Sequence, residues 1–199
     1  MMENVLQLAL TAARDAIGPD GELPYPWRKR IWAAFIDQLG SDLGIRAWSA
    51  VQVACAHRVR PVWHSTFPQE EEPMIILRAA EEGMASGVDQ SGLESQFGSL
   101  KAFLDDKLTL GQEYFPGIYA GFACLAAARE VVYRREPPDI SSELELDPDE
   151  WDASFYASLA EAGGAVWEEG VGDAEARRKY WKWFLEDPVP RAAAQFEPH

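Results

Sequence analysis

The side chains that could coordinate a metal are few in this chain. It contains three histidines, at positions 57, 64 and 199, and two cysteines, at positions 55 and 124. His57 and His64 are separated by about 10 Å of helical rise, and no third ligand type lies suitably between them. Two imidazoles at that separation do not reach one ion without such a ligand. We therefore predict no metal site, and we interpret both histidines as surface residues or members of side-chain pairs.

The common catalytic patterns are also missing from the sequence. It has no Glu-x-x-His helix of the di-iron type, no nucleophile elbow, no glycine-rich phosphate loop and no dinucleotide fingerprint. Asp105 and Asp106 are adjacent, so they point in different directions on a helix and make no catalytic pair. Because no residue is suited to a reaction, we expect a protein that is not an enzyme and that needs no cofactor.

The chemistry that remains is electrostatic. The 199 residues carry 33 acidic and 18 basic side chains, which gives a net charge of −15. A field of this sign repels nucleic acid and anionic membranes, and it accelerates the encounter with a basic protein. We expect a protein partner and neither nucleic acid nor membrane, although the same charge could serve solubility alone.

Two acidic stretches are the candidates for a partner-binding surface. The first is the proline-bracketed loop 67–73, and the second is the stretch 136–152, which contains eight acidic residues and no basic one. In the second stretch we interpret Asp147, Pro148 and Glu150 as the capped start of a helix. Capping leaves four of its carboxylates without a structural role: Glu136, Asp139, Glu143 and Glu145. The candidate binding residues are Glu70, Glu71, Glu72, Asp139, Glu143, Glu145, Asp149, Glu150 and Asp152, and a solvated loop is the alternative for each stretch.

These residues are positioned by helices, since hydrophobic periodicity predicts no convincing strand. We expect one all-α domain over residues 1–199, built from seven or eight helices. The expected segments are 3–17, 24–39, 41–67, 74–85, 97–111, 116–135, 148–162 and 174–187, with Pro188 and Pro190 ending the last one. We expect the first helix to be buried on several sides, and residues 87–98 to form a loop or a frayed helix start.

The second expected helix begins with three basic residues, and the third contains a proline. Arg28, Lys29 and Arg30 lie in the first turn of the second helix, where the helix dipole disfavours cations. We therefore expect acidic neighbours within the fold. The third helix is long, and Pro61 should kink it near its end.

The aromatic stretch 174–190 is the strongest packing signal. Tyr180, Trp181, Trp183 and Phe184 lie within five residues and cover an arc of about 200° on a helix. This helix therefore either closes a core between several other helices or leaves one edge for a partner. We favour core closure, because at least five other helices carry stripes that need a broad apolar surface.

The sequence predicts a soluble cytoplasmic protein. An acidic residue precedes the first apolar run, and no Lys or Arg occurs before Arg14, which is the wrong pattern for a signal peptide. The longest apolar run, residues 117–128, is shorter than the ~20 residues of a membrane span. Cys55 and Cys124 lie in apolar helical patterns, so we interpret them as reduced core residues.

Two stretches resemble a known family. Residues 54–80, ACAHRVRPVWHSTFPQEEEPMIILRAA, combine a helix ending in Val-x-Pro-x-Trp with an aromatic–proline–acidic turn and an Ala-Glu helix. Residues 180–190 read YWKWFLEDPVP. With the Ala-rich helix 117–129, these stretches resemble the Imm-type immunity proteins of bacterial polymorphic toxin systems, in particular the all-helical fifth family. The motif residues are Val59, Pro61, Trp63, Trp181, Trp183, Phe184 and Pro190.

The resemblance implies a cytosolic antidote that blocks a cognate toxin by tight protein–protein binding and has no catalytic residues. A basic, nuclease-like toxin domain would suit the net charge of −15. Two other classes stay open: a helical ligand-binding or enzyme domain with an apolar pocket, and a helical scaffold or oligomer. A sizeable cavity with convergent polar groups would favour the former, and a stable homo-oligomer the latter.

Overall fold

The computed structural model describes residues 5–86, 90–165, 167–168 and 171–197. Over these residues the chain forms nine α-helices, three short 3-10 helices and no strand. Only Asp187 separates the last two α-helices, and counting that pair as one gives eight, so the all-α expectation is confirmed. The α-helices are α1 (Val5–Asp15), α2 (Tyr25–Leu39), α3 (Ser41–Thr66), α4 (Glu72–Ser86), α5 (Gln90–Lys107), α6 (Phe115–Tyr133), α7 (Ala153–Ala162), α8 (Ala174–Glu186) and α9 (Pro188–Phe196); the 3-10 helices are η1 (Gln112–Tyr114), η2 (Glu143–Glu145) and η3 (Pro148–Glu150).

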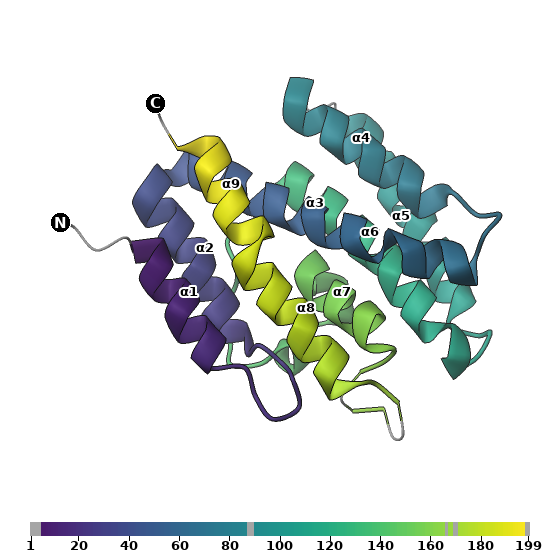
Figure 1. The fold of residues 1–199 in the computed structure, drawn as a ribbon. Coiled ribbons are helices and arrows are strands. Elements are labelled where there is room, and N and C mark those ends of the chain that lie inside the picture. Colours follow the sequence, from purple (N-terminus) through teal and green to yellow (C-terminus); the bar gives the residue numbers. More distant parts are fainter. Residues whose placement is uncertain (1–4, 87–89, 166, 169–170, 198–199) are drawn as a thin grey trace.

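Helices α3 and α6 form the centre of the domain. Helix α3 packs against α2, α6, α7 and α9, and α6 also packs against α4, α5 and α7. In Figure 1, α1 and α2 lie on one side of this pair and α4 and α5 on the other, while α8 leads into α9 across the front. Most of the other helices bury their apolar faces against this pair, whereas α1 packs against α2 and α8.

Helix α6 is a core helix because small residues let its neighbours approach. A Cβ at Gly121 would lie 2.5 Å from Leu104 Cδ2 and 2.9 Å from Trp63 Cζ3, so α3 and α5 pack directly on the glycine. By length and composition the segment Gln112–Tyr133 could cross a membrane, but 72% of its apolar window is buried inside the protein. That burial is typical of the core helix of a soluble domain.

The aromatic helix α8 closes the core, as predicted. Tyr180, Trp181 and Phe184 have no exposed surface, whereas Trp183 is partly buried. The Phe184 ring packs edge-on against Trp48 of α3, with ring centroids 6.4 Å apart. Three of the four aromatic side chains therefore belong to the core and are not available to a partner.

The Val-x-Pro-x-Trp motif at the end of α3 makes a hydrogen bond to the first acidic loop, residues 67–73. Val59 and Trp63 are fully buried, and Pro61 lies inside a helix that continues to Thr66. The indole Nε1 of Trp63 donates a hydrogen bond of 2.6 Å to the backbone oxygen of Glu70. The Val-x-Pro-x-Trp pattern thus fixes where the chain leaves α3 and turns toward α4.

Three local expectations are wrong. Helix α1 buries one face only, because Val5 and Leu8 are 46% and 49% exposed. Helix α5 begins at Gln90, inside the stretch expected to be a loop or frayed start, although residues 87–89 of that stretch lie outside the described residues. Pro188 starts α9 and does not end the helical region, because proline fits the first position of a helix without losing a hydrogen bond.

Candidate functional site

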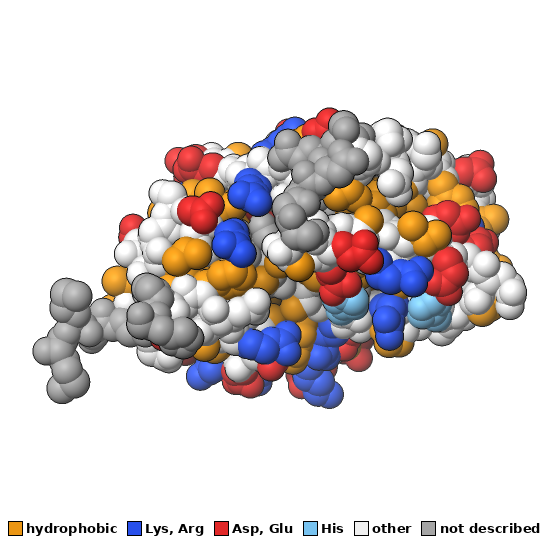
Figure 2. Space-filling view, turned by 90° about the horizontal axis from the view of Figure 1, so that it is seen from above, with side chains coloured by type: hydrophobic (Ala, Val, Ile, Leu, Met, Phe, Trp, Pro, Cys, Tyr) orange, Lys and Arg blue, Asp and Glu red, His pale blue; other side chains and the backbone are white. Residues whose placement is uncertain are grey.

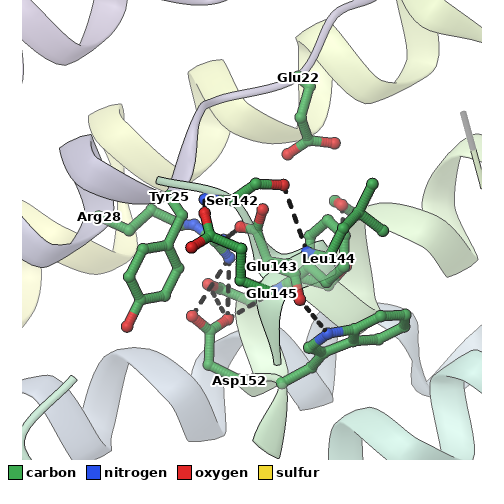
Figure 3. A network of polar contacts seen from close by, with 12 residues as sticks. Glu22, Tyr25, Arg28, Ser142, Glu143, Leu144, Glu145 and Asp152 are labelled. Atoms are coloured by element: carbon green, nitrogen blue, oxygen red, sulfur yellow. Dashed lines mark hydrogen bonds and ion pairs between the residues drawn. The ribbon is translucent and has the colours of Figure 1, made fainter. Parts of the chain in front are cut away.

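A buried arginine organises the second acidic stretch. Arg28, in the first turn of α2, is 1% exposed and forms ion pairs with Glu143 and Asp152 (Figure 3). Its guanidinium also lies 5.2–5.3 Å from the ring centroids of three aromatic residues: Tyr25, Phe155 and Trp181. The acidic neighbours expected for this first turn are therefore confirmed.

The chain from Ser141 to Asp152 folds as a series of capped turns. Ser142 and Glu145 form a capping box around η2, and Asp147 caps η3. Asp152 accepts a hydrogen bond of 2.7 Å from the backbone N–H of Phe155 and so caps α7. Three carboxylates of this stretch, those of Glu145, Asp147 and Asp152, accept hydrogen bonds from free backbone N–H groups, which is a usual role of acidic side chains at helix starts.

These contacts correct two expectations about the second stretch. The α-helix begins at Ala153 and not at Pro148, because Asp152 caps it while Asp147 caps only a single 3-10 turn. Glu143 and Glu145 have structural roles, one as the partner of Arg28 and the other in the capping box.

Side chains from four helices hold this segment, residues 138–152, against the domain; we call it the acidic strap. Lys29 lies 3.2 Å from Asp139, and Lys101 of α5 lies 3.3 Å from Asp149. Arg129 of α6 donates to the Asp149 carbonyl at 3.0 Å. Three further hydrogen bonds join Tyr25 to Pro138, Trp151 to Glu143, and Tyr156 to Pro148.

Some of the candidate partner-binding residues of the strap are exposed to solvent, and others are buried against the domain. Glu143 is buried and Asp152 is partly buried, both against Arg28. The candidates exposed on the strap are Asp139, Glu145, Asp149 and Glu150. The structure therefore separates an inner pair of carboxylates from an outer row.

The first acidic loop lies elsewhere. Glu70 forms an ion pair with Lys107 of α5, and Glu71 Oε1 lies 4.0 Å from His64 Nδ1. Glu72 is exposed at the start of α4. On the face drawn in Figure 2, histidine, acidic and basic side chains are interspersed, so the negative charge there is not one continuous patch.

A cleft of about 560 Å³ lies under the strap. Its lining combines the strap with the C-terminal end of α6, and it includes Arg28 and Glu130. Five aromatic side chains contribute to its walls: Tyr25, Trp48, Phe97, Tyr133 and Trp151. Sequence reasoning missed this cleft, because Glu130 follows Arg129 near the end of an Ala-rich helix and belongs to no recognisable motif.

Glu130 is the unusual carboxylate of the cleft. Its Oε1 is buried and accepts no hydrogen bond from the described residues. Burial, with a smaller contribution from the Asp152 carboxylate, raises its pKa from 4.5 to about 8 against the opposing attraction of Arg135 and Arg134. At neutral pH Glu130 is therefore mainly the neutral acid.

A second buried arginine, Arg177, lies near the start of α8. Arg177 is 2% exposed and donates hydrogen bonds to the carbonyls of Gly164 and Asp20, at 2.7 and 3.1 Å. Its Nε lies 3.5 Å from Glu22. Desolvation raises the pKa of Glu22 to about 7, and the attraction of Arg28 and Arg177 only partly offsets that effect.

The described histidines lie near glutamates, and the two cysteines lie in the core. His57 Nε2 lies 2.6 Å from Glu81 Oε1, which agrees with the predicted side-chain pair. Cys55 and Cys124 are buried and free, as expected for core thiols. Among the residues that the structure describes, no group of three His, Cys, Asp or Glu side chains could hold a metal ion.

Fold and site together define an all-helical domain whose distinctive polar features are two buried arginines and an acidic strap over an aromatic cleft. The model of the family Immunity protein Imm5 matches residues 12–191, and the chain therefore belongs to the Imm5 family of immunity proteins. This match confirms the resemblance seen in residues 54–80 and 180–190. No curated protein matches the chain.

Proposed function

We propose that this protein is a cytoplasmic immunity protein that neutralises a cognate polymorphic toxin by binding it directly. The observation that carries the proposal is the family match over residues 12–191. The protein works as a binder and not as an enzyme, and a basic, nuclease-like toxin domain fits its net charge of −15.

The acidic strap is the contact surface that we propose for the toxin. Leu144 at its tip is 65% exposed, an unusual position for a large apolar side chain. Two exposed aromatic residues accompany the strap: Tyr133, which lines the cleft, and Trp167, whose ring lies 5.6 Å from that of Trp151. Apolar anchors surrounded by a charged rim are the usual composition of a protein-binding surface. The outer carboxylates Asp139, Glu145, Asp149 and Glu150 supply that rim.

The loop Glu70–Glu72 is the weaker candidate surface. Glu70 is already paired with Lys107, and its backbone oxygen accepts the Trp63 hydrogen bond. Only Glu71 and Glu72 are exposed enough to meet a partner. We therefore assign the primary contact to the strap.

Co-expression with the toxin encoded beside this gene tests the proposal. Cells that carry both genes should survive, and the two proteins should co-purify as a complex. A lethal neighbouring toxin that this protein neither binds nor neutralises would refute it.

The cleft supports a second candidate function, a small-ligand-binding domain. Its volume of about 560 Å³ lies within the ~300–1,000 Å³ of typical ligand pockets, and polar groups converge on it. Native mass spectrometry of the purified protein tests this candidate. A stoichiometric small molecule that is lost on denaturation would favour it.

A further inference from the structure

The cleft contains one buried carboxyl oxygen that accepts no hydrogen bond from the described residues and belongs to no ion pair there. Glu130 Oε1 is buried, accepts no hydrogen bond from the described residues and belongs to the cleft lining. An unsatisfied buried acceptor destabilises a fold, so its retention calls for an explanation such as a functional role. A donor brought in from outside would remove this cost.

The basic residues of the cleft are already engaged. Arg28 pairs with two carboxylates, Lys29 lies 3.2 Å from Asp139, and Arg129 donates to the Asp149 carbonyl. Arg135 lies 4.8 Å from the Tyr133 ring centroid, above its face. Glu136 and Glu150, which also line the cleft, form no ion pair within the described structure. Six acidic and four basic side chains line the cleft, so its lining is acidic on balance, which favours a cation over an anion.

The walls suit a flat or compact cation. Aromatic faces attract guanidinium and ammonium groups, most strongly where water is excluded. This protein already uses such contacts inside its fold, since Arg28 lies beside three aromatic rings and Arg58 lies 4.4 Å from the Trp183 ring centroid. A second guanidinium in the cleft would meet the same kind of environment.

We propose that the cleft under the acidic strap receives an arginine or lysine side chain of the toxin, with the Glu130 carboxylate as its buried acceptor. This inference rests on the proposed function, because it names the anchor by which the toxin is held. The outer carboxylates of the strap attract the basic surface, and Glu130 then binds one basic side chain of that surface. Tyr133, which is 40% exposed, lines the cleft.

N-acetyl-L-arginine amide is the probe that tests the cleft without the toxin. Titrated into the full-length protein at pH 8, it should change the tryptophan fluorescence, because Trp48 and Trp151 line the cleft. N-acetyl-L-citrulline amide, which has nearly the same shape but no charge, should bind at least about tenfold more weakly. Glu130→Gln should weaken binding of the arginine probe by about 30-fold or more. Asp37→Asn, an exposed carboxylate of α2 outside the cleft lining, is the matched control and should bind like the wild type.

Binding of the toxin itself is the second test of the inference. Glu130→Gln should lower the affinity for the toxin by a similar factor, while its circular dichroism spectrum matches the wild type and its melting profile matches the wild type at pH 4, where the wild-type carboxyl is neutral in both the folded and the unfolded state. Equal binding of the two probes, or unchanged toxin affinity in Glu130→Gln, would overturn the inference and leave the proposed function intact. A wild-type protein that binds the arginine probe selectively but fails to neutralise the neighbouring toxin would overturn the proposed function instead.

Discussion

Arg28 and Asp152 lie 3.1 Å apart although 124 residues separate them in the chain. The contact joins the first turn of α2 to the cap of α7, and Glu143 completes the group from the middle of the strap. One guanidinium thus offsets two carboxylates in a region with little water. This buried cluster adds to the surface ion pairs and hydrogen bonds that hold the strap.

Removing the Arg28 charge should therefore be costly. Arg28→Met keeps most of the side-chain volume but leaves Glu143 buried without a counterion, and we expect a loss of about 3–5 kcal/mol in the free energy of unfolding. Urea denaturation followed by circular dichroism measures it. Lys29→Met is the control, because its partner Asp139 is 99% exposed and such pairs contribute about 1 kcal/mol or less. Equal losses in both variants would show that the Arg28 cluster stabilises nothing beyond an ordinary surface pair.

The two aspartates that could start α7 should differ in importance. Asp147→Ala should cost about 1 kcal/mol, since it removes the cap of a single 3-10 turn. Asp152→Ala should cost clearly more, because it removes both the α7 cap and a partner of Arg28. Asp152→Asn keeps the capping oxygen and isolates the charge. Thermal unfolding of the three variants gives the order, and a larger loss in Asp147→Ala would contradict it.

The aromatic helix gives a test of core closure. Trp181→Ala and Phe184→Ala should each lower the free energy of unfolding by about 3–5 kcal/mol, because both side chains are fully buried. Trp183→Ala should cost less, since that side chain is only partly buried. Chemical denaturation is again the measurement. A loss below about 1 kcal/mol for Trp181 would place its side chain at the surface.

The stability should depend on pH through Glu130. Its folded pKa of about 8 exceeds the ordinary value of 4.5, so the folded state binds more protons than the unfolded state between these values. Stability therefore falls as pH rises from about 4.5 to about 8, by up to about 1.4 kcal/mol per pH unit, and changes little on this account outside that interval. Glu22, with a pKa of about 7, adds to the slope below pH 7.

Glu130→Gln should remove much of this slope. The variant should match the wild type near pH 4, where the wild-type carboxyl is neutral in both the folded and the unfolded state, and exceed it in stability at pH 9. Urea denaturation midpoints of both proteins, measured between pH 4 and pH 9, test this prediction. Identical pH profiles for the two proteins would show that Glu130 ionises in the fold without cost.

The tip of the strap should matter for binding and not for folding. Leu144→Ala removes an apolar side chain that is 65% exposed, so stability should change by less than about 0.5 kcal/mol. Affinity for the toxin should fall by about tenfold or more if Leu144 is an interface anchor. Calorimetric titration of the toxin measures this loss. Leu110→Ala, at a residue 50% exposed and far along the chain from the strap, is the matched control.

Helix content and burial could be predicted from the sequence because they depend on local periodicity. The spacing of apolar residues in α3 and α8 placed Cys55, Trp181 and Phe184 in the core, and the structure confirms all three. The unfavourable position of Arg28 at a helix start likewise showed that carboxylates must lie nearby. The family, too, was accessible from two short stretches of packing residues.

Only the tertiary structure decided which carboxylates those are. Asp147 and Asp152 are both acceptable helix caps locally, and α7 starts at the latter because its carboxylate also meets Arg28 and its neighbour Ser154 meets Gln52. The same applies to Glu130, an ordinary helical glutamate in sequence that the strap covers and deprives of water. Charge pairing and desolvation depend on segments that lie beyond the reach of a local pattern, as Arg28 and Asp152 do at 124 positions apart, whereas periodicity reports only on neighbours within a turn or two. The sequence thus determined the helices and their buried faces, and the packing of those helices determined which charges are buried, paired or left free to bind.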